Sequence, residues 1–168
     1  MEARLVEVAL DVLGVEAREC EACPHVGEGG AVFASIGFAG EDMHGALAVL
    51  GLEPAVRAVV AAVFGTPADS DALLCDMVGE LSNLLLGRYR AVLLREGIEI
   101  LPATPLTLRA AEVDIRGIAS RQASWRLLQT PQGQLWLCLD VSFREGFELA
   151  SASAEPVTPN EQPLMFFE

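Results

Sequence analysis

The sequence predicts an α+β fold in which helices cover one face of a mixed or antiparallel sheet. Residues 69–96 carry apolar side chains at helical spacing over one long stretch. Residues 134–143 alternate between aliphatic and other side chains, which is typical of a strand. The order along the chain is helix, hairpin, helix, long helix and then several strands. Sequential hairpins of this kind favour antiparallel pairing.

Length and charge limit the classes of protein to consider. The chain has 168 residues, 52% of them apolar, which is enough to bury a substantial core. We expect residues 1–149 to form one domain and residues 150–168, which contain proline, serine and glutamate, to form a tail. The net charge of −13 argues against nucleic acid and against an anionic membrane surface as partners. No apolar run is long enough to span a bilayer, and nothing resembles a signal peptide, so we expect a cytoplasmic protein.

The first third of the chain contains a helix and a hairpin. Residues 2–13 place their apolar side chains on one face and precede a glycine, which predicts an amphipathic helix. Residues 15–30 form a short strand or a loop. Residues 31–38 and 44–50 are apolar, of strand length and separated by a turn-like segment, which predicts a hairpin. A glycine at position 45 indicates either a bulge or a close backbone approach.

Two helices follow the hairpin. Pro54 stands where proline fits best, in a first helical turn, and predicts a helix over residues 54–64 that stops at a glycine. The long helix over residues 69–96 begins at a residue that can cap it, either Asp69 or Ser70. A glycine follows its last turn, where an arginine also lies.

The last part of the globular chain reads as strands. Residues 98–101 and 106–108 are short strands around prolines that suit an edge or a bend. Residues 111–118 are ambiguous. Residues 120–129 and 134–143 are the clearest strands, and the proline and glycine between them indicate a turn.

One face of the long helix carries a line of polar and small residues. They are three or four positions apart and therefore share a face: Asp76, Glu80, Asn83, Gly87 and Arg90. Glu80 and Asn83, one turn apart, place a carboxylate and a carboxamide side by side. The glycine one turn further on would let another molecule approach the helix closely. A solvated surface is the alternative interpretation of the same residues.

Other candidates for chemistry are weaker. Cys20, Cys23 and His25 form a Cys-x-x-Cys pair with a histidine, but a structural zinc site needs four ligands. Cys75 and Cys138 lie within apolar patterns, as core cysteines do. We interpret the pair as ordinary loop thiols in a reducing compartment and expect no metal site. A metal or redox role for the pair remains the competing hypothesis.

Three further features argue against other kinds of site. His44 stands alone at a strand start, where we expect it to face solvent. Ser82 is about 100° around the helix from Asn83, which argues against a joint role in a catalytic triad. The glycine-rich residues 27–30 lack the lysine and hydroxyl residue of a phosphate loop.

The segment Gly79-Glu-Leu-Ser-Asn-Leu-Leu-Leu-Gly87 resembles the helix motif of the CheC/CheX/FliY family of chemotaxis phosphatases, a Glu-x-x-Asn followed four residues later by glycine. The likeness continues through the Thr-Pro step at residues 104–105 and covers about residues 1–145. CheC-type members carry two such motifs. Asn83 is the only asparagine before the tail, so the likeness is to the CheX-like arrangement. The chain departs from the family pattern at Arg109, near a position where a glycine is frequent.

The resemblance implies hydrolysis of the aspartyl phosphate on a CheY-like response regulator, in chemotaxis or related two-component signalling. It implies that Asn83 positions the attacking water and that Glu80 pairs with a cation of the regulator. The phosphorylated regulator would supply the Mg²⁺, so we expect no cofactor bound by this chain. The resemblance also implies a homodimer formed through a strand edge. The alternative is a non-catalytic interaction module of the same fold, which binds a signalling or flagellar-switch partner through the same helix.

Overall fold

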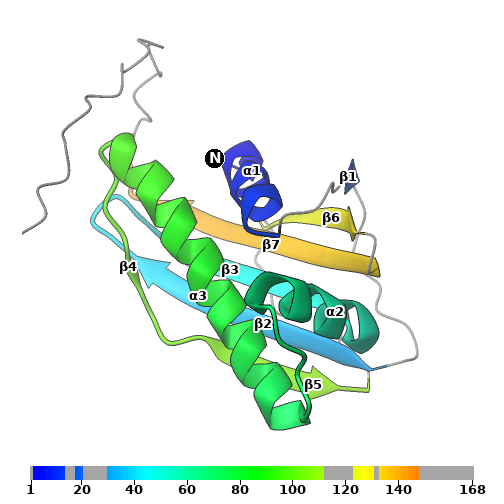
Figure 1. Cartoon of the computed structure of the whole chain (residues 1–168). Helices are drawn as coiled ribbons and strands as arrows, with labels where there is room; N and C mark the ends of the chain where they lie inside the picture. The colour runs from blue at the N-terminus through cyan, green and yellow to red at the C-terminus, as the bar shows by residue number, and fades with distance from the viewer. Residues whose placement is uncertain (1, 14–17, 21–29, 112–122, 131–132, 148–168) are drawn as a thin grey trace, which may run out of the picture.

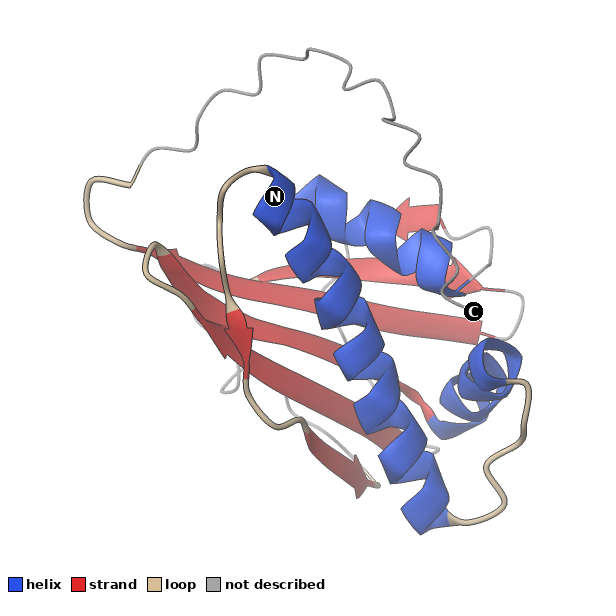
Figure 2. Cartoon of the chain, turned by 60° about the vertical axis from the view of Figure 1, so that its left-hand side comes forward, coloured by secondary structure: helices blue, strands red, loops and turns tan. Residues whose placement is uncertain are grey.

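Three helices lie on one face of an antiparallel sheet in the described part of the chain (Figure 1). Figure 2, with helices in blue and strands in red, shows all three on the same side. The expected α+β class, with helices over one face, is confirmed. The tail expected at residues 150–168 lies outside the described residues. The computed structural model describes residues 2–13, 18–20, 30–111, 123–130 and 133–147.

The sheet has seven strands among these residues, in the order β1-β6-β7-β3-β2-β4, with β5 also paired to β2. Every pairing is antiparallel. The expected hairpin is formed by β2 and β3, and the expected C-terminal hairpin by β6 and β7. The strands are β1 (Arg18–Cys20), β2 (Ala31–Ala39), β3 (Met43–Leu52), β4 (Leu101–Pro102), β5 (Leu106–Ala110), β6 (Ser124–Thr130) and β7 (Gly133–Phe143).

The segment after the long helix differs from the sequence expectation. A strand was expected over residues 98–101, yet only Leu101 and Pro102 pair with β2. Ile98 and Ile100 are buried in the core instead. The reason is that β2 ends at Ala39 and the chain turns back after Gly40, so residues 98–100 meet no strand residue with which to pair. Residues 112–118, which the sequence left ambiguous, lie outside the described residues.

The helices begin and end where local chemistry directs. α1 (Glu2–Leu13) and α2 (Glu53–Phe64) match the expected spans, and α2 ends at Gly65, whose positive φ of 70° lets its N–H donate to the carbonyl of Ala61. α3 (Asp71–Arg95) has Ser70 as its cap. The Ser70 hydroxyl accepts from the N–H of Leu73 at 3.2 Å, so of the two candidate caps the serine is the one used.

The main core lies between the helices and the sheet. α3 contributes Leu81, Leu85 and Tyr89, all at most 1% exposed, and β3 contributes Leu47. Gly79, on the underside of α3, is also buried, and a Cβ added there would lie 3.4 Å from the methyl group of Thr107 on β5. The helix therefore lies directly against β5 at this position.

Gly45 marks a close backbone approach rather than a bulge. It pairs with Val141 in an uninterrupted ladder between β3 and β7. A Cβ added to it would overlap the carbonyl oxygen of Asp140 and also meet the ring of Phe38 at 3.0 Å. Only glycine fits between these two strands at this position.

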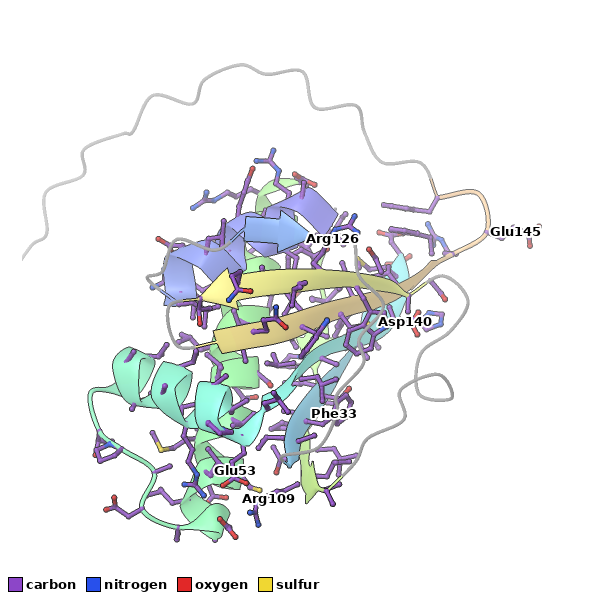
Figure 3. The ribbon with its side chains drawn as sticks, turned by 90° about the vertical axis from the view of Figure 1, so that its right-hand side faces the viewer. Phe33, Glu53, Arg109, Arg126, Asp140 and Glu145 are labelled. Carbon is purple, nitrogen blue, oxygen red and sulfur yellow. The ribbon has the colours of Figure 1, made fainter. Side chains whose placement is uncertain are left out.

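The opposite face of the sheet, here called the outer face, is also apolar. Neighbouring strands place Phe33, Leu50 and Trp136 directly side by side on it, and all three are buried. No helix of the described chain lies over them (Figure 3). The alternation in β7 therefore separates two apolar surfaces: Leu137 points towards the helices, whereas Cys138 belongs to the outer face.

Candidate functional site

Glu80 and Asn83 lie near the middle of α3, on the side turned away from the sheet. Glu80 is exposed and Asn83 is half-buried, so both side chains are accessible from solvent. The helix places them there because Leu81 and Leu85 occupy the opposite side and anchor it in the core. The polar line expected from sequence therefore lies on the solvent-facing side of a helix whose other side is packed in the core.

The two side chains contact each other. The amide nitrogen Nδ2 of Asn83 donates to Oε1 of Glu80 at 3.5 Å, a long and therefore weak hydrogen bond. This contact orients the amide, with its nitrogen beside the carboxylate. The carbonyl oxygen Oδ1 has no hydrogen-bond partner among the described residues. A half-buried carbonyl oxygen facing an open surface can accept a hydrogen bond from water or from another protein.

The remaining residues of the line share that surface. Asp76 and Gly87 are exposed and Arg90 is half-buried. A Cβ added to Gly87 would meet nothing within 4 Å. Internal packing therefore does not require this glycine, and the bare helix backbone is open to an approaching molecule.

The other candidates from sequence do not join this site. Ser82 is buried and donates to the carbonyl of Val78 at 3.1 Å, so its hydroxyl is used within the helix. His44 is exposed, as expected, and lies on β3 at the outer face. There it lines an open hollow of about 610 Å³ together with Asp140 and Ser142. That hollow and α3 are on opposite faces of the sheet.

Of the cysteines in the described chain, Cys138 offers little reactivity. Burial raises the pKa of the Cys138 thiol to about 12, which keeps it protonated and unreactive. Cys75 is half-buried and free. Cys23 of the Cys-x-x-Cys pair and the nearby His25 lie outside the described residues. Within the described residues, no cluster of three or more His, Cys, Asp or Glu could hold a metal ion.

A charged cluster that the sequence did not predict joins three elements at one end of α3. Arg57 of α2 donates to Glu53 at 2.8 Å, to Asp71 at 2.7 Å and to the carbonyl of Ala68 at 2.6 Å. Arg109 of β5 donates to the other oxygens of the same two carboxylates. Figure 3 shows Glu53 and Arg109 next to each other. The cluster fixes the first turn of α3 against α2 and β5.

The electrostatics of this cluster are those of matched charges. Hydrogen bonds from Arg109 and then Arg57 lower the pKa of Glu53 below its usual value. The hydrogen bond to Glu53 raises the pKa of Arg109 in turn. The carboxylates neutralise both guanidinium groups, so the cluster stabilises the fold and offers no free cation to a ligand. Only one contact of the cluster could be expected from the sequence: Glu53 and Arg57 are four residues apart within a helix.

No helix in the described part of the chain is long and apolar enough to cross a bilayer. This finding agrees with the absence of a long apolar run in the sequence.

The structure thus has a helix-covered antiparallel sheet and a solvent-accessible Glu-x-x-Asn on the longest of its described helices. This is the fold of the CheX and CheC class of chemotaxis proteins, which the sequence resembled. A scan against protein-family models gives no match, and a search of curated proteins gives none either. The fold is therefore recognised through solved structures.

Three solved structures illustrate the similarity. A CheC-like superfamily protein from Shewanella sp. PV-4 has a TM-score of 0.68 at 21% identity, covering 84% of this chain and 94% of that one. Chemotaxis protein CheX from Vibrio vulnificus has a TM-score of 0.67 at 20% identity, with coverage of 84% and 93%. The CheX–CheY–BeF3–Mg complex from Borrelia burgdorferi has a TM-score of 0.61 at 17% identity, with coverage of 83% and 94%. At such identities the similarity establishes the fold.

Proposed function

We propose that this protein hydrolyses the aspartyl phosphate of a CheY-like response regulator, and that Asn83 and Glu80 act in that reaction. The observation that carries the proposal is the solvent-accessible pair of these two side chains, joined by one hydrogen bond, on a helix anchored in the core. A protein of the same fold from Borrelia burgdorferi forms a complex with CheY, BeF3 and Mg. That complex supports a regulator as the partner here.

The proposed reaction needs little from this chain beyond position. Water attacks the phosphorus in line with the bond to the regulator's aspartate. That P–O bond breaks, the aspartate leaves as a carboxylate, and inorganic phosphate forms. An acyl phosphate has a good leaving group, so orientation and charge stabilisation account for most of the acceleration. Asn83 would accept a hydrogen bond from the attacking water through Oδ1 and donate one to a phosphoryl oxygen through Nδ2.

Glu80 has a second task in this scheme. In the free protein it accepts a hydrogen bond from Nδ2 of Asn83. When the regulator docks, a lysine ammonium group of the regulator would take the place of the amide as partner of the Glu80 carboxylate. The amide nitrogen would then be free to donate to the phosphoryl group. The carboxylate thus couples docking to release of the catalytic amide.

The test is a dephosphorylation assay on a phosphorylated CheY-like receiver domain. Wild-type protein should accelerate loss of phosphate, and Asn83→Ala should lower that rate at least about 100-fold, as loss of a transition-state hydrogen-bond partner does. Binding of the receiver should persist in this variant. Asp76→Ala, on the same exposed face of the same helix, is the matched control and should retain activity.

Two results would decide against the proposal. If wild-type protein binds receivers but never accelerates loss of phosphate, the chain is a non-catalytic interaction module of the same fold. If Asn83→Ala remains fully active, the amide has no catalytic role, and the reaction must be carried out elsewhere on the surface.

We also propose that the protein forms a homodimer through the sheet edge at β4 and β5. Leu101 and Leu106 on these strands are 64% and 63% exposed, and β5 pairs on one side only among the described strands. An apolar strand edge is a common site of association. Light scattering should give a dimer mass that Leu106→Glu converts to a monomer. Leu94→Glu, at an exposed leucine on α3, is the control, and a monomeric wild type would contradict the proposal.

A further inference from the structure

Three arginines of α3 lack, among the described residues, the carboxylate partner that four other described arginines have. Arg88, Arg90 and Arg95 make no ion pair or side-chain hydrogen bond among the described residues. The chain carries a net charge of −13, so acidic side chains are abundant. Four other arginines of the described chain each lie within ion-pair distance of an acidic residue: Arg4, Arg57, Arg109 and Arg144.

The helix dipole explains only one of the three. A cation is favoured by the carbonyl end of a helix, but this effect fades within the last turn. Arg95 is the last residue of α3, whereas Arg88 and Arg90 lie seven and five residues before it. These two positions therefore require another explanation.

The arrangement around them leaves a bare strip of backbone. At about 100° per residue, Arg88 and Arg95 fall on one flank of the exposed face and Arg90 on the other. Gly87 and Ala91, four residues apart, lie between the flanks. A Cβ at Gly87 would meet nothing within 4 Å, although glycine weakens a helix interior relative to alanine. The protein thus keeps an unfavourable residue where its own packing does not need one.

The sign of charge changes along this face at Asn83. Asp76 and Glu80 precede it, and the three arginines follow it. Gly87 is one turn from Asn83, about 6 Å along the axis, and Arg90 is about 10 Å away. A molecule that docks on α3 therefore meets negative groups at one end and positive groups at the other.

We propose that Gly87, Arg88, Arg90, Ala91 and Arg95, here called the arginine strip, dock the acidic rim of the response regulator's phosphorylation site. The inference rests on the proposed function for the identity of the partner. A phosphoryl group bound to Mg²⁺ requires carboxylates around it, so such a site presents a negative rim. With that rim on the strip and a regulator cation on Glu80, the phosphoryl group faces Asn83. The reversed orientation would place carboxylate against carboxylate, which is disfavoured.

The strip should act mainly on association. Exposed ion pairs add little affinity each, whereas complementary fields raise association rates and make them depend on salt. The arginine strip is therefore a positioning surface, and its signature is kinetic.

The experiment measures association of a Mg²⁺-loaded, BeF3-activated CheY-like receiver domain from the same genome, by stopped flow at low and high salt. R88E/R90E/R95E should slow association by about tenfold or more at low salt, and the difference should shrink at high salt. R88K/R90K/R95K, which keeps the charge, should associate nearly as fast as wild type. R90E against R144E compares equal charge changes on and off the strip, and only R90E should slow association.

Gly87→Leu tests the bare backbone separately. Because open space surrounds position 87, this variant should fold at least as stably as wild type yet associate about tenfold more slowly. Thermal unfolding of every variant verifies that the fold is intact.

Three outcomes would overturn the inference: unchanged association of the folded triple glutamate variant at low salt, equal slowing by R90E and R144E, or a change in oligomeric state instead of receiver binding. The last would mean that a second copy of the chain occupies the strip. The two proposals fail separately. Arginine-dependent binding without phosphate release refutes only the phosphatase, whereas phosphate release that ignores the strip refutes only the docking surface.

Discussion

Arg109 and Glu53 are separated by 56 residues in the sequence, yet the guanidinium of the first donates directly to the carboxylate of the second. Both also belong to the cluster with Arg57 and Asp71 that holds the first turn of α3. The long helix is therefore fixed at its start by charges and along its length by the core. This arrangement leads to predictions that need no regulator.

Replacing Arg57 by methionine should destabilise the protein by about 1–3 kcal/mol. The change keeps the apolar stem but removes the donors to Glu53, Asp71 and the carbonyl of Ala68, which leaves polar groups unpaired. Urea unfolding followed by circular dichroism measures the difference. Arg144→Met is the control, because that arginine is 55% exposed and pairs only at the surface, and it should cost less than about 1 kcal/mol. Equal losses would mean that the cluster is ordinary surface charge.

Stability should fall in acid because of Glu53. Its pKa is lowered in the folded protein, chiefly by the hydrogen bond from Arg109, so the folded state holds this proton less tightly than the unfolded chain does. The contribution of Glu53 to the free energy of unfolding is complete above the usual pKa of a glutamate. It is lost as the pH falls through the lowered pKa of the folded state. Melting temperatures measured between pH 7 and pH 3 should decline more steeply in wild type than in Glu53→Gln. If the melting temperatures of the two proteins decline in parallel, Glu53 is not the cause of the loss of stability in acid.

Gly45→Ala should be strongly destabilising, by about 1–3 kcal/mol or more, because its Cβ would overlap the backbone of β7 and the strands must separate. Gly87→Ala is the contrasting variant. It adds the same methyl group in open space within a helix and should stabilise by about 0.5–1 kcal/mol. Denaturant midpoints of the two variants should therefore move in opposite directions from wild type.

Ser70→Ala should cost about 1 kcal/mol, the usual value of an N-cap, because the N–H of Leu73 loses its acceptor. Asp69→Ala should change stability by less than half of that, since Asp69 makes no hydrogen bond or ion pair among the described residues. If Asp69→Ala is less stable than Ser70→Ala, the cap has been assigned to the wrong residue.

Local patterns in the sequence were sufficient for most of the fold. The spacing of Leu81 and Leu85 placed the buried side of the long helix, and the composition of the two segments around residue 41 placed the first hairpin. Even the close approach at Gly45 was one of two expected alternatives. These features depend on neighbours within a few residues, so periodicity and turn chemistry reveal them.

Features that depend on distant contacts were not predictable in the same way. Arg109 pairs with residues from two other elements, and nothing in its own segment indicates this. The alternation in β7 indicated a strand but gave no sign that Trp136 and Cys138 would form a second buried apolar surface. At the candidate site, spacing alone placed Glu80 and Asn83 together. That the arginines beyond them lack partners could be learned only from the space around each side chain.

α3 is a single unbroken helix of 25 residues, and the amide, the carboxylate and the arginine strip all belong to it. The helix geometry therefore fixes the separation between these groups. Adding or removing one residue shifts every residue beyond it by about 1.5 Å along the axis and rotates it by about 100°. Insertions and deletions between residues 80 and 95 would misalign all the contacts at once. New partner preferences in such a protein must then arise by substitution of side chains along α3, never by a change in the length of this helix.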